Sequence, residues 1–310
     1  MPGTLVVRLC NWVGEVVLSV PSLRRLESAG YALHLVGKPW APRLLAGTGW
    51  PVTVRASGLL AAARQMRALK AQLAPHGAAP APQALLMTKS LSSALETRLG
   101  GVPPAGYAYD GRSWLLSRAF PLPKFEHAAF AYWQLVSDYL GVAAPYPTEV
   151  GLHPSETQTR AAHALLATHA LQPGGYCMLC PFSGADDRQG RKVWPGFRDL
   201  AQEFRTRGIA LVVCPGVGEE AMSAALPGVI TLAGLDLGVY AALLASARTV
   251  IANDTGPGHL AAAVGARLIS IFGPSSSALW APLGANVVLM HDAIWPSVER
   301  VVQASLETCP

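Results

Sequence analysis

The sequence predicts an α/β protein with two parallel sheets, each doubly wound by helices. Short apolar runs alternate with helical stretches along the chain, which is the pattern of strands joined by crossover helices. The pattern occurs in two halves, and 310 residues suffice for two domains of ordinary size. Hydrophobic residues make up 51% of the chain and charged residues 14%, so each half can bury a core.

The first half opens with an apolar run at 5–9, which we predict to be a strand, followed by a polar turn and a helix starting at Glu15. A second strand is expected at 31–37. Further elements are helices near 40–46 and 59–73 and a strand at 84–87. Proline and glycine residues between 140 and 154 mark the exit from this half, so we assign the first domain to 1–150.

A helix near 155–169 is expected to link the halves, and the linker is assigned to 151–172. The second domain, 173–292, is predicted to hold strands at 176–180, 209–213, 229–232, 249–251 and 268–272, with helices at about 195–207 and 237–247 and after 255. Residues 293–310 are expected to form a C-terminal helix that packs back towards the first domain.

The most informative stretch, residues 252–263, joins an apolar run to a helix through a polar turn. Unpaired N–H groups at a helix start carry partial positive charge and suit a phosphate. Thr255 adds a hydroxyl, His259 a ring nitrogen and Asp254 an acceptor. The alternative is an N-cap at Asp254 or Thr255 followed by a structural histidine. On this stretch alone both interpretations stay open.

Other strand ends also carry polar groups, and ligands of doubly wound sheets bind beyond the carboxyl ends of the strands. Glu15 lies at a helix start, where a carboxylate often only complements the helix dipole. The loop 183–192 contains Ser183 and Lys192, and its length favours a functional loop, although a lone loop lysine is usually just solvated. Glu219 follows a glycine-rich turn at another strand end.

The formal charge of +5 fits an anionic substrate or a membrane surface. Lysine and arginine are dispersed and form no nucleic-acid motif, so we expect no nucleic-acid partner. No run of roughly 18 uncharged apolar residues and no signal-peptide layout occurs, so we expect a cytoplasmic protein without a transmembrane helix. The five cysteines are widely spaced, which predicts buried structural thiols and no metal site.

Several short motifs occur along the chain in a fixed order, at 11–15, 192–195, 216–219, 254–263, 272–274 and 280–282. With them the chain resembles glycosyltransferase family 9, the ADP-heptose:lipopolysaccharide heptosyltransferases. The resemblance implies the GT-B fold of two Rossmann-like domains facing across a cleft, with the acceptor on the first domain and ADP-heptose on the second. It also implies inverting transfer of heptose to the inner core of lipopolysaccharide, at the cytoplasmic face of the inner membrane, with no required metal or other cofactor.

The resemblance assigns nucleotide-sugar-binding roles to residues of the second half. Ser183 and Lys192 would hold the diphosphate, offsetting the charge that grows as ADP departs. Thr255 and Gly256 would donate to the same phosphates, and His259 would lie close to them. In addition, Asp254 would support the turn or contact the nucleotide, and Glu219 would accept from the ribose hydroxyls.

One residue departs from the family pattern. The family usually has aspartate after Asn-Trp-Val-Gly, taken as the base that deprotonates the acceptor hydroxyl, and here the residue is Glu15. Glutamate has similar basicity but reaches one methylene further, and a displacement of about 1 Å can cost around a hundredfold in rate. We hypothesise that Glu15 is the base. The alternative is a non-catalytic homologue that binds the sugar nucleotide.

The acceptor side is expected on the helix near 59–73, where Arg64, Arg67 and Lys70 recur every third residue and can share one face. Such a stripe would grip an acidic glycolipid, whereas its other interpretation is a solvated helix face. A further alternative is a dinucleotide-dependent oxidoreductase, because residues 256–261 match G-x-G-x-x-A. The motif comes late in the chain, and the strand at 268–272 ends without the acidic residue that binds a ribose.

Overall fold

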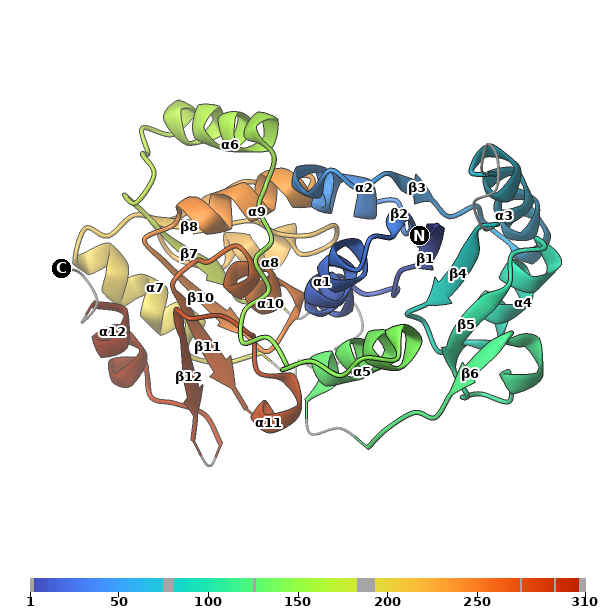
Figure 1. The fold of residues 1–310 in the computed structure, drawn as a ribbon. Helices are drawn as coiled ribbons and strands as arrows, with labels where there is room; N and C mark the ends of the chain where they lie inside the picture. Colours follow the sequence, from blue (N-terminus) through green and yellow to red (C-terminus); the bar gives the residue numbers. More distant parts are fainter. Residues whose placement is uncertain are drawn as a thin grey trace. The chain divides into compact units, whose positions relative to one another are not determined.

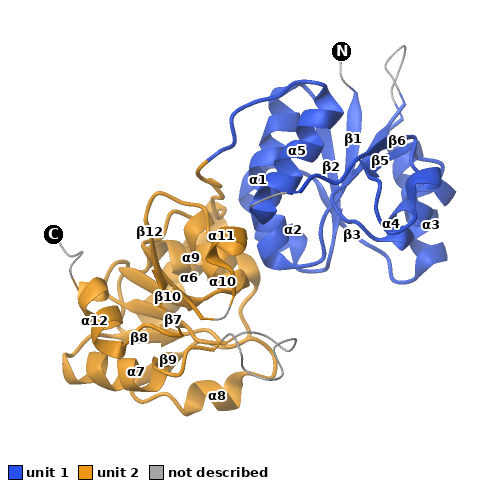
Figure 2. Cartoon of the chain, turned by 90° about the horizontal axis from the view of Figure 1, so that it is seen from below, with its two compact units in different colours: residues 1–147 blue, residues 148–310 orange. Residues whose placement is uncertain are grey.

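The computed structural model describes residues 3–74, 81–124, 127–182, 193–273, 275–292 and 294–306. The chain divides into two compact units, residues 1–147 and 148–310, which Figure 2 colours separately. Each unit contains one parallel six-stranded sheet with helices on both faces (Figure 1). The predicted class of two doubly wound parallel sheets is therefore confirmed.

The sheet of the first unit has the strand order β3-β2-β1-β4-β5-β6. Its strands are β1 (Thr4–Arg8), β2 (Ala32–Gly37), β3 (Val52–Val54), β4 (Gln83–Leu86), β5 (Pro104–Tyr107) and β6 (Arg118–Phe120). Its helices are α1 (Val13–Ser28), α2 (Ala41–Leu44), α3 (Leu59–Gln72), α4 (Leu91–Leu99) and α5 (Ala128–Leu140), with 3-10 turns at Ala46–Thr48 and Ser113–Leu115. Helices α1 and α5 pack together on one face of the sheet, and α3 and α4 pack together on the other (Figure 2).

The sheet of the second unit has the order β12-β11-β10-β7-β8-β9. Its strands are β7 (Cys177–Cys180), β8 (Leu211–Val213), β9 (Val229–Thr231), β10 (Thr249–Asn253), β11 (Leu268–Phe272) and β12 (Val287–His291). Its helices are α6 (Glu156–Thr168), α7 (Phe197–Thr206), α8 (Glu220–Ala224), α9 (Leu237–Ser246), α10 (Gly256–Ala263), α11 (Ser277–Trp280) and α12 (Val298–Leu306). Helices α6 and α10 both pack against α9, whereas α7 packs against α12.

The central strands are apolar on both faces, as a strand between two helix layers must be. In β1, Leu5, Val6 and Val7 are inaccessible to solvent, and so are Val250 and Ile251 of β10. Counted within each unit, both sheets have the strand order 3-2-1-4-5-6. The winding of the chain therefore changes direction between β1 and β4 in the first unit and between β7 and β10 in the second. Ligands of doubly wound sheets bind at such switch points, beyond the carboxyl ends of the strands.

Helices α6 and α12 both have packing partners within the second unit. Helix α6, expected as part of a linker, packs against α9 and belongs to the second unit. Helix α12, expected to pack towards the first domain, lies against α7 and β11, and its Val301 and Val302 join the core of the second unit. An apolar stripe at helical spacing predicts that α12 buries one face, but it does not say which neighbour covers it.

Several elements were not predicted: β3, β5, β6, β12, α4 and α5. Strands β3 and β6 have three residues each, too few to show a period. Strand β5 contains Pro104 and Gly106, which argue against a strand. A Cβ atom at Gly106 would lie 3.0 Å from Nη2 of the buried Arg112, so a larger residue there would require Arg112 to shift.

Candidate functional site

At the switch point of the first unit, the chain leaves β1 and enters α1 within five residues. Glu15 lies in the first turn of α1 and is half-buried. Its Oε1 accepts a hydrogen bond of 3.0 Å from the hydroxyl of Tyr132. Tyr132 belongs to α5, which packs along α1, and its side chain is buried. The Glu15 carboxylate is thus held in place by a side chain 117 residues away in sequence.

Cys10 lies beside this pair at the end of β1. Its thiol donates to the Met87 carbonyl at 3.4 Å and interacts with the Tyr132 hydroxyl. Burial, with the Glu15 charge in second place, raises the pKa of Cys10 to about 12. Burial, followed by Cys10 and Glu15, raises the pKa of Tyr132 well above its usual value of 10.0. Both groups keep their protons at neutral pH, so Tyr132 acts as a hydrogen-bond donor to Glu15.

A cluster of buried charged residues stabilises the turn between β1 and α1. Glu96 of α4 is 2% exposed and accepts from Arg8 Nε at 3.3 Å and from Arg55 Nε at 3.0 Å. Arg8 also donates to Asn11 Oδ1 at 3.2 Å. Arg8 therefore fixes the turn that leads to Glu15. The only sign of this cluster in the sequence is Arg8, a charged residue inside an apolar run.

At the switch point of the second unit, Asp254 and Thr255 lead from β10 into α10. Asp254 and His259 are buried, at 5% and 6% exposure. The N–H groups of Gly258 and His259 donate to the Thr255 carbonyl at 3.0 and 3.3 Å. Thr255 occupies the N-cap position, but its hydroxyl lies 3.4 Å from the Asn253 carbonyl and makes no capping hydrogen bond in the described chain. The structural N-cap interpretation is thus correct for the position of Thr255 and wrong for its hydroxyl.

Asn253, which sequence analysis gave no role, fastens both sides of the neighbouring β7-to-α7 connection. Its amide Nδ2 donates to the Pro181 carbonyl at 2.8 Å, and its Oδ1 accepts from the Trp194 N–H at 3.0 Å. Trp194 is itself buried and donates through Nε1 to the Pro296 carbonyl at 2.9 Å. Ser183 and Lys192, both predicted to bind phosphate, lie in this connection outside the described residues. A buried asparagine at the end of an apolar strand was the signal available in the sequence.

Glu219 lies at the same edge of the sheet, after β8. Its Oε2 accepts from the Gly216 N–H at 2.8 Å, which closes the turn before α8. Its charge contributes to raising the pKa of Tyr240, after burial and two cysteines, and the Tyr240 hydroxyl lies 3.1 Å from Cys180 Sγ at the end of β7. The structure therefore places Glu219, Asp254, Thr255, Gly256 and His259 along the carboxyl edge of one sheet.

Comparison with known proteins decides the family. The family model described as glycosyltransferase family 9 (heptosyltransferase) matches residues 68–309. The chain belongs to glycosyltransferase family 9. The match begins after α1 and so does not include Glu15. The assignment of Glu15 to the site therefore rests on the motif at residues 11–15 and on the geometry described above.

Sequence relatives match part of the chain, and solved structures match most of it. The chain is 29% identical to lipopolysaccharide heptosyltransferase 1 of Pseudomonas aeruginosa over 64% of its own length and 56% of that protein. It is 32% identical to lipopolysaccharide heptosyltransferase 3 of Escherichia coli over 39% of this chain and 37% of that protein. These matches span about half or less of the curated relatives. The solved structure of E. coli ADP-heptose lps heptosyltransferase II matches with a TM-score of 0.76 at 20% identity, over 93% of this chain and 90% of that one.

A second structural match is the glycosyltransferase family 9 protein from Veillonella parvula, with a TM-score of 0.81 at 18% identity over 97% and 91% of the two chains. At such identities the likeness shows the fold, which is the GT-B type expected for family 9. The two Rossmann-like sheets described above are its two domains.

The basic stripe expected to bind the family's acceptor has a different environment. Arg67 donates to the Leu99 carbonyl at 3.3 Å, and Lys70 donates to the Gly101 carbonyl at 2.6 Å. Both carbonyls lie at or just beyond the C-terminal end of α4, where a cation complements the helix dipole. Arg64, one turn earlier on α3, is exposed. The acceptor role of these residues stays a prediction, and two of them have an observed structural contact.

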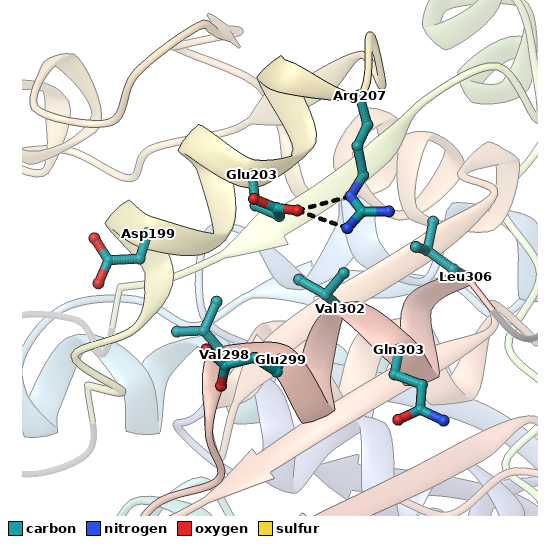
Figure 3. Close-up of a pocket in the computed structure, with 8 residues that line it drawn as sticks. All are labelled: Asp199, Glu203, Arg207, Val298, Glu299, Val302, Gln303 and Leu306. Atoms are coloured by element: carbon teal, nitrogen blue, oxygen red, sulfur yellow. Dashed lines mark hydrogen bonds and ion pairs between the residues drawn. The ribbon is translucent and has the colours of Figure 1, made fainter.

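A pocket of about 480 Å³ lies between α7 and α12, away from the predicted site residues (Figure 3). Its wall includes Asp199, Glu203, Arg207 and Glu299, with Glu203 and Arg207 joined by an exposed ion pair. Among the described residues, no group of three histidine, cysteine or acidic side chains is arranged to hold a metal ion. Within the same residues, no helix is long and apolar enough to cross a membrane.

Proposed function

We propose that this protein transfers heptose from ADP-heptose to the inner core of lipopolysaccharide, with inversion at the anomeric carbon. The observation that carries the proposal is the family 9 match over residues 68–309. The names of the relatives support it, because they include lipopolysaccharide heptosyltransferases, and one solved structure of the same fold is E. coli heptosyltransferase WaaC with ADP.

The donor is assigned to the second unit. The start of α10 supplies the Gly256 N–H and the Thr255 hydroxyl to the diphosphate, with His259 beside them. Ser183 and Lys192 remain predicted phosphate ligands. Glu219, which the Gly216 N–H holds within its turn, is the acceptor assigned to the ribose hydroxyls. Asp254, buried at the end of β10, is assigned to supporting the turn or contacting the nucleotide.

The base is assigned to Glu15 in the first unit. Its carboxylate takes the proton of the acceptor hydroxyl as that oxygen attacks the anomeric carbon of heptose. The bond between this carbon and the β-phosphate oxygen breaks, and ADP leaves with the electron pair. The donors of the second unit stabilise the negative charge that develops on the departing phosphate. The scheme assigns no step to a metal or other cofactor.

The acceptor is assigned to an acidic glycolipid, and the formal charge of +5 supports an anionic partner. Because such an acceptor is anchored in the inner membrane, the protein is expected to work on its cytoplasmic face by peripheral contact. Arg64, which is exposed and lies nearer the start of α3 than Arg67 and Lys70, is the member of the basic stripe best placed to meet it.

An ADP-release assay tests the proposal. The protein is mixed with ADP-heptose and with truncated lipopolysaccharides that end in Kdo or in one heptose. Release of ADP stimulated by one acceptor, with the mass gain of one heptose, is expected. No stimulation by any acceptor, with ADP-heptose still bound, would instead favour a non-catalytic sugar-nucleotide-binding protein.

The variant Glu15→Gln tests the base. It keeps the size of the side chain and removes the proton acceptor, so kcat should fall by about 10²- to 10⁴-fold while ADP binding stays unchanged. Full turnover by this variant at saturating substrates would remove Glu15 from the reaction.

A further inference from the structure

The contact between Tyr132 and Glu15 goes beyond what a core tyrosine needs. Tyr132 is 5% exposed, and its ring packs inside the first unit, yet its hydroxyl reaches a carboxylate at the switch point. Within the described chain, this is the hydrogen bond that the Glu15 carboxylate receives from another side chain. It occupies Oε1 and leaves Oε2 for a substrate.

We infer that Tyr132 is the positioning residue for Glu15, selecting one conformation of the glutamate so that Oε2 meets the acceptor hydroxyl. The inference rests on the proposed role of Glu15 as the base. It also explains how this chain uses glutamate where the family usually has aspartate.

Glutamate has one more rotatable bond than aspartate and therefore more conformations to lose when it is fixed. A general base works only within hydrogen-bond reach of the proton it takes, so an unrestrained glutamate would spend much of its time misplaced. A donor at Oε1 removes this freedom. An aspartate at the same position would end one methylene short of the Tyr132 hydroxyl.

The structure holds Tyr132 itself firmly. It lies in the middle of α5, between the buried Ala131 and Leu135, and α5 packs along α1. The Cys10 thiol approaches its hydroxyl from the end of β1. Burial keeps the proton on Tyr132, so its hydroxyl remains a hydrogen-bond donor. The carboxylate of Glu15 is the acceptor of this hydrogen bond.

The variant Tyr132→Phe removes the hydroxyl and keeps the ring. Since hydrogen bonds to charged groups are among the stronger ones, kcat should fall by about 10- to 100-fold, while KM for ADP-heptose and for acceptor changes by less than about twofold. Tyr139→Phe is the matched control. Tyr139 is a buried tyrosine of the same helix whose hydroxyl donates to Gln83 Oε1 at 3.0 Å, away from Glu15. This control should lose stability to a similar degree and keep its kcat.

A double-mutant cycle with Glu15→Asp separates positioning from general support of the fold. In the Glu15→Asp background the carboxylate no longer reaches Tyr132, so adding Tyr132→Phe should change kcat by less than about twofold. A purely structural role would instead lower kcat equally in both backgrounds.

The outcomes distinguish this inference from the proposed function. If Glu15→Gln is inactive and Tyr132→Phe keeps full kcat, Glu15 is the base and the inference is wrong. If Tyr132→Phe and Tyr139→Phe lower kcat alike, the inference is also wrong. If Glu15→Gln keeps full activity, the proposed role of Glu15 as the base is wrong, and the positioning role of Tyr132 is wrong with it. A drop in kcat that Tyr132→Phe shows, that Tyr139→Phe does not show and that is absent when Tyr132→Phe is added to Glu15→Asp supports the positioning role.

Discussion

The two switch points share a topology and differ in the groups that line them. In the first unit the polar groups are charged or titratable side chains held by one another: Glu15 by Tyr132, and Glu96 by Arg8 and Arg55. The second unit also has buried titratable groups, Asp254 and His259. There, however, the contacts of Asn253 and of the Thr255 carbonyl are made with backbone groups of the neighbouring connection and of α10.

The helices after β1 and β10 show the same contrast. Helix α1 has a carboxylate of its own, Glu15, in its first turn. The first turn of α10 is Gly256, Pro257, Gly258 and His259. The positive end of a helix favours a nearby anion. The chain thus supplies an anion within the first turn of α1 and none within the first turn of α10. This difference fits the proposed division, with the base in the first unit and the diphosphate in the second.

The largest expected effect comes from breaking the buried cluster under the first switch point. Glu96→Gln leaves Arg8 buried without a counter-charge, so the free energy of unfolding should fall by about 3–5 kcal/mol. Glu203→Gln is the control, because the exposed Glu203–Arg207 pair in Figure 3 should contribute less than about 0.5 kcal/mol. Urea unfolding of both variants measures the difference. Equal losses would mean that the first switch point is not stabilised by its charges.

In the second unit, Asn253→Ala should have the next largest effect. It leaves the Trp194 N–H and the Pro181 carbonyl without their buried partner, which costs about 1–3 kcal/mol of stability. It should also weaken ADP binding, because both sides of the connection containing Ser183 and Lys192 lose their anchor. Calorimetric titration with ADP measures this. Asn286→Ala, whose exposed amide donates to the Gly265 carbonyl, is the control and should bind ADP normally.

Sequence analysis identified those parts of the site that lie close together in the chain. Glu15 comes one short turn after an apolar run, and the turn at 254–259 follows another, so local pattern was enough to select them. It could not identify the partners that hold them. Tyr132 lies 117 residues from Glu15, and Trp194 lies 59 residues from Asn253. Only the folding of distant elements onto each other brings these pairs together.

The basic stripe on α3 shows a different limit of local pattern: a role was predicted from spacing along one helix alone. A three-residue spacing correctly places Arg67 and Lys70 on one helix face. It says nothing about what these side chains contact, and in the structure both donate to carbonyls at the end of α4 while Arg67 stays exposed. Tertiary contacts of this kind are the part of the site that spacing along one helix does not contain.

Alkaline pH should affect both units alike. Cys10 lies two residues after β1 and Cys180 is the last residue of β7, each at a switch point, and burial raises the pKa of both to about 12 from 9.0. Above pH 9 the unfolded chain loses these protons and the folded chain keeps them, so stability present below that pH is lost as pH rises. By pH 10 the loss is about 1.4 kcal/mol for each thiol. Cys10→Ala and Cys180→Ala should each make the dependence of unfolding free energy on pH shallower between 9 and 11, by similar amounts. A change in only one would show that the two strand ends differ in solvent access.

The smallest effects are expected on α3, and they sharpen the comparison by asking whether the acceptor meets the first unit there. Helices α3 and α4 run from the carboxyl edge of the sheet back to its amino edge, so Arg67 and Lys70 meet the end of α4 far from the switch point. Arg67→Ala and Lys70→Ala should each reduce stability by about 0.5 kcal/mol and change the acceptor KM by less than about twofold. Arg64→Ala should raise the acceptor KM more than either, because Arg64 lies nearer the start of α3 and so nearer the carboxyl edge of the sheet. A several-fold rise in acceptor KM for Arg67→Ala or Lys70→Ala would show that the stripe binds the acceptor despite its contacts with α4. The acceptor would then extend well beyond the carboxyl edge of the sheet.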